Sequence, residues 1–287
     1  MYKKGNLMSN IKLIALDLDG TLFATDGTIS AHTIDVLTQA RNAGIEVIIS
    51  TGRPFCGLPL DQLKGTGMHY AITANGAAVY ETADRTCLFE NPMEPDLLLP
   101  ILDFLLKQDI HMDAFIHGDG FSPLDRLSIA KKLVIPDSLK KYIIETRTRV
   151  DDFAGFIREN HLSVQKMTLN FTKLPDGTMK CRDKVKDYLL STGLVTVVSG
   201  GYRNLEFTRL GVTKGAALKQ LADTLHIPIE QTMAVGDTEN DLSILKAAGL
   251  GVAMGNALPE IKAQADAVTC TNDEDGVACA IEKFALS

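Results

Sequence analysis

Two acidic residues follow directly on a strand-like segment near the start of the chain. The apolar run Ile11–Leu16 leads into the segment DLDGT, which holds Asp17 and Asp19. Because side chains alternate along a strand, both carboxylates are expected on the same side, with their Cα atoms about 7 Å apart. Two carboxylates at that spacing repel each other unless a cation or a shared proton lies between them. The segment therefore predicts a reaction centre, or else a plain Asp-Gly turn that ends a strand.

A second strand-like segment, residues 46–50, ends in groups that suit a phosphate oxygen. Thr51 and Gly52 follow it, and Arg53 stands one residue further on. A threonine hydroxyl, together with backbone N–H groups at the start of a helix, can bind phosphate. Taken alone the pattern is weak, because such corners also occur without function. Arg53 is a candidate for substrate contact because it directly follows Gly52.

Lys214 lies in the segment GVTKG, where a helix is expected to begin. A lysine at this position opposes the positive end of the helix dipole. A bound anion would explain its presence there. A solvated surface lysine explains it about equally well, so the residue is ambiguous on its own.

The segment GDTEND follows a third strand-like run, residues 232–235, and carries Asp237, Asn240 and Asp241. Asp237 can cap the following helix, which would account for it without any further function. Asn240 and Asp241 follow three and four residues later and face the same way in a helical turn. Capping does not account for a further acid on the buried side, so we expect these side chains to belong to a site.

The first and last thirds of the chain alternate short apolar strands with amphipathic helices. This alternation is typical of a parallel sheet covered by helices on both faces. The expected strands and helices there cover residues 11–16, 30–43, 46–50, 70–73, 213–226, 232–235, 239–248, 251–253 and 274–285.

Ligands of open α/β sheets bind at the carboxyl ends of the strands. We therefore expect Asp17, Asp19, Thr51 and Asp237 at one edge of the sheet, with Lys214 nearby. Several hard oxygen ligands of this kind suit Mg²⁺, and the sequence has no Cys/His cluster for a softer metal.

The middle of the chain has a different pattern. Helical stretches at 97–107 and 180–190 stand among strand-like runs and turn signals such as the segment PDG at 175–177. We interpret residues 85–209 as a second, α+β module inserted into the first domain. That domain would then comprise residues 11–84 and 210–287, and residues 1–10 would form a loose tail.

Composition excludes several function classes. The chain has 287 residues, 45% of them hydrophobic, with 29 Lys plus Arg against 36 Asp plus Glu, a net charge of −7. Ample apolar material for a core excludes intrinsic disorder, and the negative charge argues against nucleic acid and anionic membranes as partners. No signal peptide or transmembrane run is apparent, and five scattered cysteines without a CxxC pair fit a reduced, cytoplasmic protein.

Two other residue types attract attention in the sequence but are given ordinary roles. His111 and His117 are spaced widely in the inserted module, and we expect surface or loop histidines because no third metal ligand has suitable spacing. The five cysteines are expected to be small buried hydrophobic residues.

The four segments DLDGT, ISTGRP, GVTKG and GDTEND, in this order and spacing, resemble the four motifs of the haloacid dehalogenase (HAD) superfamily phosphohydrolases. The stretch 20–50 leaves no room for a cap domain between the first two motifs, whereas 52–213 accommodates the inserted module. This arrangement resembles the Cof-type, type IIB branch. The resemblance implies an α/β fold, with a Rossmann-like HAD core built on a parallel sheet and an inserted α+β type IIB cap that sets substrate specificity.

The resemblance also implies a catalytic role for the matching residues. Asp17 would be the nucleophile and form an aspartyl-phosphate. Asp19 would protonate the leaving oxygen and then deprotonate the attacking water. Lys214 and Thr51 would hold the transferring phosphoryl group.

Further positions are implied to bind phosphate or metal. Mg²⁺ would be held by the Asp17 carboxylate, the Asp19 backbone carbonyl and Asp237, and Asp241 would support these ligands. The other implied phosphate-binding positions are Leu18, Gly52 and Asn240, with Arg53 as a supporting residue.

These expectations add up to an Mg²⁺-dependent phosphomonoester hydrolase that acts on a small phosphorylated metabolite, with sugar phosphates as the leading class. One alternative is a phosphotransferase or mutase that passes the phosphoryl group from Asp17 to an acceptor other than water. Another is a non-catalytic protein that binds a phosphorylated metabolite, although a binder needs no acid–base carboxylate at Asp19. The sequence leaves open the substrate, the specificity residues of the cap and the oligomeric state.

Overall fold

A computed structural model describes residues 10–287, and these divide into two compact units. The first unit holds the described residues up to Gly52 together with Leu58–Phe89 and Thr213–Ser287, and the second holds Arg53–Gly57 and Glu90–Val212. Apart from Asn10, the loose tail expected over residues 1–10 lies outside the described residues. The five residues Arg53–Gly57 group with the second unit, although the motif that they follow belongs to the first.

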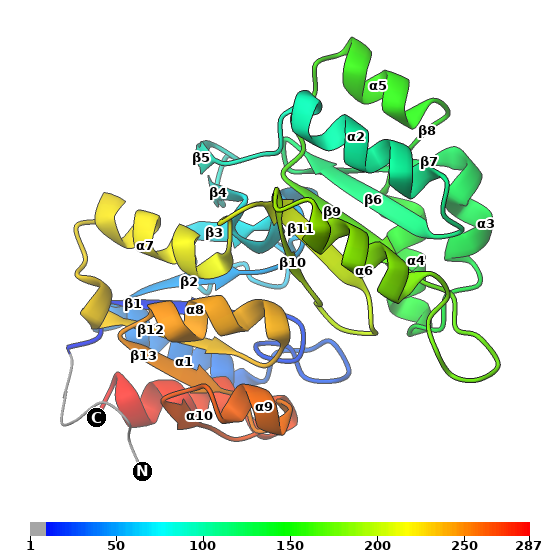
Figure 1. The fold of residues 1–287 in the computed structure, drawn as a ribbon. Coiled ribbons are helices and arrows are strands. Elements are labelled where there is room, and N and C mark those ends of the chain that lie inside the picture. Colours follow the sequence, from blue (N-terminus) through cyan, green and yellow to red (C-terminus); the bar gives the residue numbers. More distant parts are fainter. Residues whose placement is uncertain (1–9) are drawn as a thin grey trace. The chain divides into compact units, whose positions relative to one another are not determined.

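Strands and helices follow one another as the alternating pattern predicts (Figure 1). The strands are β1 (Leu13–Leu16), β2 (Glu46–Ser50), β3 (Tyr70–Thr73), β4 (Ala78–Glu81), β5 (Cys87–Glu90), β6 (His111–Ile116), β7 (Asp119–Pro123), β8 (Thr148–Val150), β9 (Lys166–Asn170), β10 (Val195–Val198), β11 (Leu205–Arg209), β12 (Thr232–Gly236), β13 (Leu250–Ala253) and β14 (Ala267–Val268).

The helices are α1 (Ala31–Asn42), α2 (Pro95–Leu106), α3 (Leu127–Ala130), α4 (Asp137–Thr146), α5 (Phe153–Glu159), α6 (Arg182–Ser191), α7 (Lys214–Thr224), α8 (Leu242–Ala247), α9 (Pro259–Lys262) and α10 (Gly276–Phe284). None of the helices among residues 10–287 is long and apolar enough to cross a membrane.

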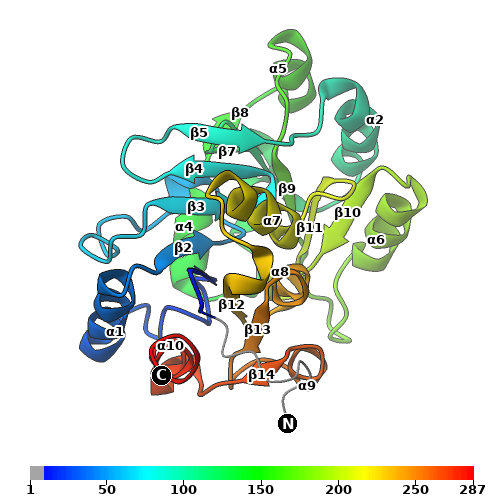
Figure 2. The ribbon, with the colours of Figure 1, turned by 90° about the vertical axis from the view of Figure 1, so that its left-hand side faces the viewer.

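An eight-stranded sheet organises the described part of the first unit, in the order β14-β13-β12-β1-β2-β3-β4-β5, which can be followed from bottom to top in Figure 2. Neighbouring strands from β14 to β3 run parallel, and β4 turns back antiparallel to β3. β1 pairs with β2 on one side and β12 on the other, so it lies between strands from the two ends of the chain. This arrangement brings the carboxyl ends of β1, β2 and β12 to a single edge.

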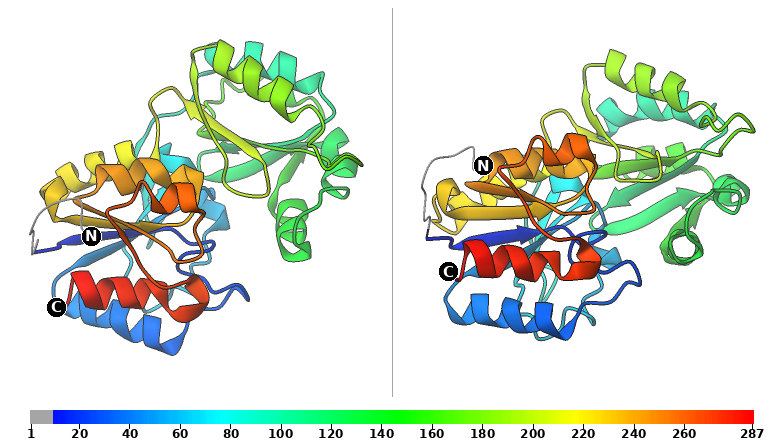
Figure 3. Two further views of the ribbon diagram at one scale, coloured as in Figure 1. Left: turned by 60° about the horizontal axis from the view of Figure 1, so that its bottom comes forward. Right: turned by 90° about the horizontal axis from the view of Figure 1, so that it is seen from below.

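Helices cover both faces of this sheet, as expected for continuous apolar strands (Figure 3). On one face, Leu13, Ile48 and Ile72 form a buried cluster with Leu218 of α7 and Leu245 of α8. On the other face, α1 and α10 lie side by side, with α1 packed against β2. The N-cap of α1 is Ser30, whose hydroxyl accepts a hydrogen bond from the backbone N–H of Thr33.

The second unit contains its own six-stranded sheet, in the order β10-β11-β9-β6-β7-β8. Its strands pair antiparallel except for β7 and β8, which run parallel. One face packs on α2, α5 and α6 through a buried apolar cluster that includes Met112, Leu102 and Ile157. Alternation along the strands places charged and polar side chains on the opposite face.

A buried ion pair stands on this polar face. Lys166 Nζ lies 2.8 Å from Glu206 Oε1 and 4.9 Å from the centre of the Phe115 ring. The Lys166 side chain is only 1% exposed. Burying a charge is costly unless a counter-charge stays with it, so removing one member of the pair is expected to destabilise the unit.

Replacing Glu206 by Gln is expected to lower the free energy of unfolding by about 3 kcal/mol, because the buried Lys166 ammonium loses the carboxylate that lies 2.8 Å from it. Urea unfolding of the variant and the wild type measures the difference. Glu145→Gln, at an exposed position of α4, is the matched control. An unchanged unfolding midpoint for Glu206→Gln would show that the pair contributes nothing.

Two residue-level expectations from the sequence are wrong. His111 is fully buried, and its ring nitrogens lie 3.4 Å from Ser122 Oγ and 3.3 Å from Asn170 Nδ2, because its strand position faces the polar side of the second sheet. Its pKa is lowered, chiefly by burial. His117, in contrast, is exposed as expected. The cysteines are not buried hydrophobic residues: Cys56, Cys87 and Cys270 are exposed, and Cys181 and Cys279 are half-buried.

Candidate active site

The predicted residues of the first unit meet at the carboxyl edge of the eight-stranded sheet. Asp17 follows β1, Thr51 follows β2 and Asp237 follows β12. Asp17 and Thr51 are 7% and 1% exposed. The parallel order of these three strands brings together side chains that lie up to 220 positions apart in the chain.

Lys214 is the first residue of α7 and is completely buried. Its Nζ donates to Asp17 Oδ1 at 2.8 Å and to Asp241 Oδ1 at 2.6 Å. Thr213 forms the N-cap of α7, and its hydroxyl accepts a hydrogen bond from the backbone N–H of Ala216. The surface-lysine alternative is therefore wrong, because two buried carboxylates hold the ammonium at the base of the site.

Burial and charge set the protonation of this group of residues. Burial raises the pKa of Asp17 well above its usual range, Lys214 lowers it, and Asp241 and Asp237 raise it again. Burial alone would lower the pKa of Lys214, but Asp17 and Asp241 together raise it above its ordinary value. Burial and the charge of Asp241 raise the pKa of Asp237 to about 7. The single positive charge of Lys214 does not balance the negative charges that Asp17, Asp237 and Asp241 would carry together.

Asp241 has both carboxylate oxygens engaged. Oδ1 accepts from Lys214, and Oδ2 accepts from the backbone N–H groups of Asp237 and Thr238 at 3.1 and 3.0 Å. Thr238, not Asp237, is the N-cap of the short helix Glu239–Asp241, and it forms a capping box with Asp241. Asp237 is therefore not a capping residue, and its side chain is available to the site.

Asp19 and Leu18 lie in a turn and not on the strand. β1 ends at Leu16, and the chain closes the turn with hydrogen bonds from Thr21 N and Phe23 N to Leu18 O. The argument from strand alternation therefore does not apply to Asp19. Asp17 is buried and Asp19 is exposed.

The segment after Thr51 also differs from the expected helix start. Gly52 is followed only by a short 3₁₀ turn, Phe55–Gly57, so no α-helix dipole stands behind Thr51. Thr51 N donates to Ile72 O at 2.8 Å. Arg53 belongs to the second unit, where its guanidinium donates to Gly57 O and lies 5.5 Å from the centre of the Tyr142 ring.

Asn240 reaches a residue that our sequence analysis did not assign to the site. Its Nδ2 donates to Asn75 Oδ1 at 3.3 Å. Asn75 is 4% exposed and has a φ of 58°, a left-handed conformation that asparagine tolerates better than most residues. The Asn-Gly pair at 75–76 marks this position in the sequence, and alone it predicts a turn.

The backbone of Gly76 lies against the start of α7, where Lys214 stands. Gly76 has a φ of +95°, and a Cβ on it would lie 2.2 Å from Thr213 O and 2.9 Å from Lys214 N. The start of α7 therefore packs directly on the backbone of this glycine. Only glycine satisfies both the left-handed conformation and the close approach.

Gly76→Ala is expected to destabilise the protein by about 2 to 4 kcal/mol, from backbone strain and overpacking combined, and to lower activity by displacing Lys214. Gly27→Ala is the matched control, because Gly27 also has a positive φ, of +82°, but a Cβ there meets nothing within 4 Å. The unfolding free energy of both variants is measured in urea. The loss in Gly27→Ala reports backbone strain alone, and the additional loss in Gly76→Ala reports the contact with α7. Equal losses in the two would show that the contact with α7 is unimportant.

Asp17, Asp237 and Asp241 each offer a carboxylate oxygen, and these atoms lie within 4.8 Å of one another. Both oxygens of Asp241 already accept hydrogen bonds from Lys214 and two backbone N–H groups. Of these three carboxylates, Asp17 and Asp237 are therefore the better candidates for binding a cation. A set of hard oxygen ligands beside raised carboxylate pKa values fits a divalent cation such as Mg²⁺.

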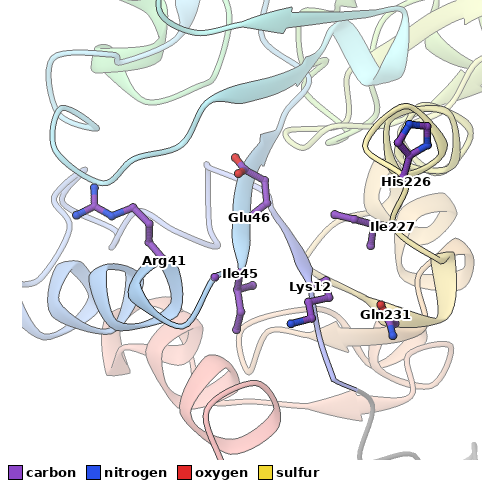
Figure 4. Close-up of a pocket in the computed structure, with 8 residues that line it drawn as sticks. Lys12, Arg41, Ile45, Glu46, His226, Ile227 and Gln231 are labelled. Atoms are coloured by element: carbon purple, nitrogen blue, oxygen red, sulfur yellow. The ribbon is translucent and has the colours of Figure 1, made fainter.

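A pocket of about 370 Å³ lies elsewhere in the first unit (Figure 4). It is lined by Lys12, Glu46 and Gln231, which stand at the amino ends of β1, β2 and β12, and by Arg41, Gly44, Ile45, His226 and Ile227. This is the edge of the sheet opposite to Asp17 and Asp237, so the pocket is separate from the site.

Comparisons with known proteins show the family to which the chain belongs. The family model of haloacid dehalogenase-like hydrolases matches residues 14–281. The phosphatase YwpJ of Bacillus subtilis is 35% identical over 286 residues, which cover 93% of this chain and 98% of that protein. The pyridoxal phosphate phosphatase YbhA of Escherichia coli is 31% identical, with 93% of this chain and 96% of YbhA covered.

Solved structures give the same result for the fold. A haloacid dehalogenase-like hydrolase from B. subtilis superposes with a TM-score of 0.81 at 31% identity, covering 95% of this chain and 99% of that one. The HAD subclass IIB sugar phosphatase BT4131 has a TM-score of 0.79 at 25% identity, covering 96% and 100%. The motif residues at the sheet edge, the family match and these relatives together show that the chain belongs to the haloacid dehalogenase superfamily, in its Cof-type, subclass IIB branch, and is a phosphatase.

Proposed function

We propose that the chain is an Mg²⁺-dependent phosphomonoesterase that acts through an aspartyl-phosphate on Asp17, with a sugar phosphate as its substrate. The observation that carries the proposal is the buried contact of Asp17 with Lys214, with Asp237 beside them at the carboxyl edge of the sheet. Simple binding of a phosphate does not require carboxylates, which repel an anion. A carboxylate can instead act as the nucleophile that attacks phosphorus, with a cation close by to offset the charge.

In the first half-reaction, a carboxylate oxygen of Asp17 attacks phosphorus and the bond from phosphorus to the leaving oxygen breaks. Asp19 gives its proton to that oxygen, so the alcohol leaves neutral. Thr51 and Lys214, with Leu18, Gly52 and Asn240, hold the phosphoryl oxygens. Lys214 is fixed in advance by Asp241, so it needs no reorganisation when negative charge gathers.

In the second half-reaction, Asp19 takes a proton from water as the water oxygen attacks phosphorus. The bond between phosphorus and the Asp17 oxygen breaks, which releases inorganic phosphate and restores the carboxylate. Asp17, the Asp19 carbonyl and Asp237 would hold Mg²⁺, which when bound offsets charge on the phosphoryl group. Asp241 fixes the backbone at Asp237 and so supports that ligand.

Two of the similar proteins support the choice of substrate class. BT4131 is named a sugar phosphatase, and a relative in B. subtilis that is 30% identical, YcsE, is named a 5-amino-6-(5-phospho-D-ribitylamino)uracil phosphatase. Both names describe a phosphate on a polyhydroxylated carbon chain. We assign the inserted module, expected at residues 85–209 and bounded in the structure as Glu90–Val212 with Arg53–Gly57, to a cap that contacts this part of the substrate. Arg53 would be a further substrate contact.

Phosphate release from a panel of phosphorylated sugars, nucleotides and cofactors tests the proposal. We expect turnover with Mg²⁺ and none with EDTA, and a sugar phosphate at the top of the ranking. Acid quenching with a ³²P-labelled substrate should recover labelled protein from the wild type. Transfer of phosphate to added sugar without release would show a phosphotransferase instead, and tight binding without turnover would show a non-catalytic protein.

A further inference from the structure

Asn256 is a polar residue that touches the site but belongs to none of the four motifs. It follows β13 in the loop after Met254, and its side chain is exposed. Its Nδ2 donates to the backbone carbonyl of Gly20 at 2.8 Å and to Asp237 Oδ2 at 3.4 Å. One amide group therefore joins the turn after Asp19 to the carboxylate that follows β12.

A hydrogen bond to the side-chain oxygen of Asn256 fixes the orientation of this amide. Asn256 Oδ1 accepts a hydrogen bond from the backbone N–H of Asn272 at 3.0 Å. A backbone N–H can only donate, so the oxygen of the Asn256 amide must face it and the NH₂ group must face Gly20 and Asp237. The contact to Asp237 thus follows from the fold and is not a free choice of rotamer.

The turn that fixes Asn256 is itself rigidly built. Thr271 and Glu274 form a reciprocal capping box around the short helix Asn272–Glu274. The same turn also holds the segment after Asp19, because Asn272 Nδ2 donates to Phe23 O at 3.0 Å. Asp273 adds two more bonds, accepting from the backbone N–H of Thr25 at 2.7 Å and from its hydroxyl at 2.8 Å.

Each carboxylate oxygen of Asp237 accepts a hydrogen bond from a neighbouring side chain. Oδ1 accepts from the Thr21 hydroxyl at 3.3 Å, and Oδ2 receives the Asn256 amide. A carboxylate that binds a metal needs such outer partners to fix its direction, because each lost partner leaves it more orientations in the absence of the metal. Gly20 is close as well, since a Cβ there would lie 2.5 Å from Asp237 Oδ2.

We propose that Asn256 is a positioning residue for the metal site: its amide holds the Asp237 carboxylate and, through the Gly20 carbonyl, the turn that carries the Asp19 carbonyl. The inference rests on the proposed function, because it takes Asp237 as a metal ligand. Asn256 itself makes no contact with substrate or metal in this role. Its effect is on the affinity for the cation, and the chemistry at Asp17 is unchanged once the cation is bound.

The test measures Mg²⁺ binding directly, by calorimetry on the full-length protein without substrate. Asn256→Ala removes both amide contacts, and Asn256→Leu removes them at nearly constant side-chain size. Both are expected to weaken Mg²⁺ binding by about 10- to 100-fold, the usual effect of losing an outer partner of a metal ligand. The kcat of both variants should return towards the wild-type value at saturating Mg²⁺.

Two controls isolate the contact. Asn272→Ala loses the bond to Phe23 but keeps its backbone N–H on Asn256, so we expect Mg²⁺ binding close to that of the wild type. Asn42→Ala changes an exposed asparagine at the end of α1. Thermal unfolding midpoints in EDTA show whether each variant is folded, and Asn256→Leu keeps the test open should the alanine variant unfold.

The outcomes separate this inference from the proposed function. Wild-type Mg²⁺ affinity in a folded Asn256 variant would overturn the positioning role and leave the phosphatase proposal intact. Equal weakening in Asn272→Ala and Asn256→Ala would assign the effect to the turn and overturn the role of the amide. A wild-type protein that binds no Mg²⁺ would overturn the proposed metal dependence, and this inference with it.

Discussion

Asp17→Asn is expected to lose phosphate release by a factor on the order of 10⁴ or more, the scale on which removal of a nucleophile acts. Asn has the same shape but its neutral amide cannot attack phosphorus. The variant should still fold, since its amide oxygen can accept the hydrogen bond from Lys214 that Asp17 Oδ1 accepts at 2.8 Å. Acid quenching should recover no labelled protein from it.

The same substitution is expected to raise the stability of the metal-free protein. The pKa of Asp17 in the folded state is raised well above its ordinary 3.8, chiefly by burial, so folding favours the protonated form and the ionised form costs stability. This cost grows as the pH rises above about 4, because the unfolded chain ionises first. The gain in unfolding free energy for Asp17→Asn, measured by urea in EDTA, should therefore be larger near neutral pH than in acid.

Asp35→Asn is the control, because it removes one carboxylate from an exposed position of α1. It should change neither activity nor the pH dependence of unfolding. Turnover retained in Asp17→Asn would rule out this residue as the nucleophile. A variant less stable than the wild type in EDTA would show that the bond to Lys214 outweighs the burial of the charge.

Lys214→Met has the second largest expected effect, and it acts on stability and activity together. The substitution keeps the length of the side chain but leaves the Asp17 and Asp241 carboxylates buried without their shared cation. We expect a loss of about 3 to 5 kcal/mol in unfolding free energy. Activity should fall by at least about 10²- to 10³-fold, because a preorganised positive charge is missing where phosphoryl charge gathers.

A double substitution separates the two effects. Adding Asp241→Asn to Lys214→Met removes the uncompensated charge, so much of the stability should return while activity stays lost. Lys219→Met, at an exposed position of the same helix, is the control. Urea unfolding and phosphate release are measured on all four proteins. Recovery of activity in the double variant would contradict the phosphoryl-holding role of Lys214.

The sequence predicts the site well where residues sit at the ends of strands. Asp17, Thr51 and Asp237 each follow an apolar run, and the rule that parallel strands end at one edge is enough to bring them together. Lys214 could not be placed from the sequence. A lysine at a helix N-terminus is ordinarily exposed, and its burial depends on two carboxylates that arrive from distant segments.

Local hydrogen bonds explain most of the remaining errors. Asp237 and Thr238 are both good N-cap residues. Thr238 is the cap because Asp241 stands three residues after it and completes a capping box with it. His111 lies on the same sheet face as Ser122 and Asn170, which come from other strands of the second unit. The sequence around His111 does not reveal which residues of neighbouring strands will contact it. Asn75 and Asn256 act through contacts of their side-chain amides, which leave no periodic signal in the sequence.

The pairing of β1 with both β2 and β12 has a consequence for how the protein folds during synthesis. Asp17 and Lys214 are 197 residues apart, and all of the second unit is translated between them. The second unit therefore can leave the ribosome and fold while β1 still lacks one of its two neighbours. Over that interval the nascent first unit exposes unpaired, apolar strand edges, which are prone to aggregation. The site is incomplete until the chain after Val212 has been synthesised, because that part supplies Lys214 and the strand β12.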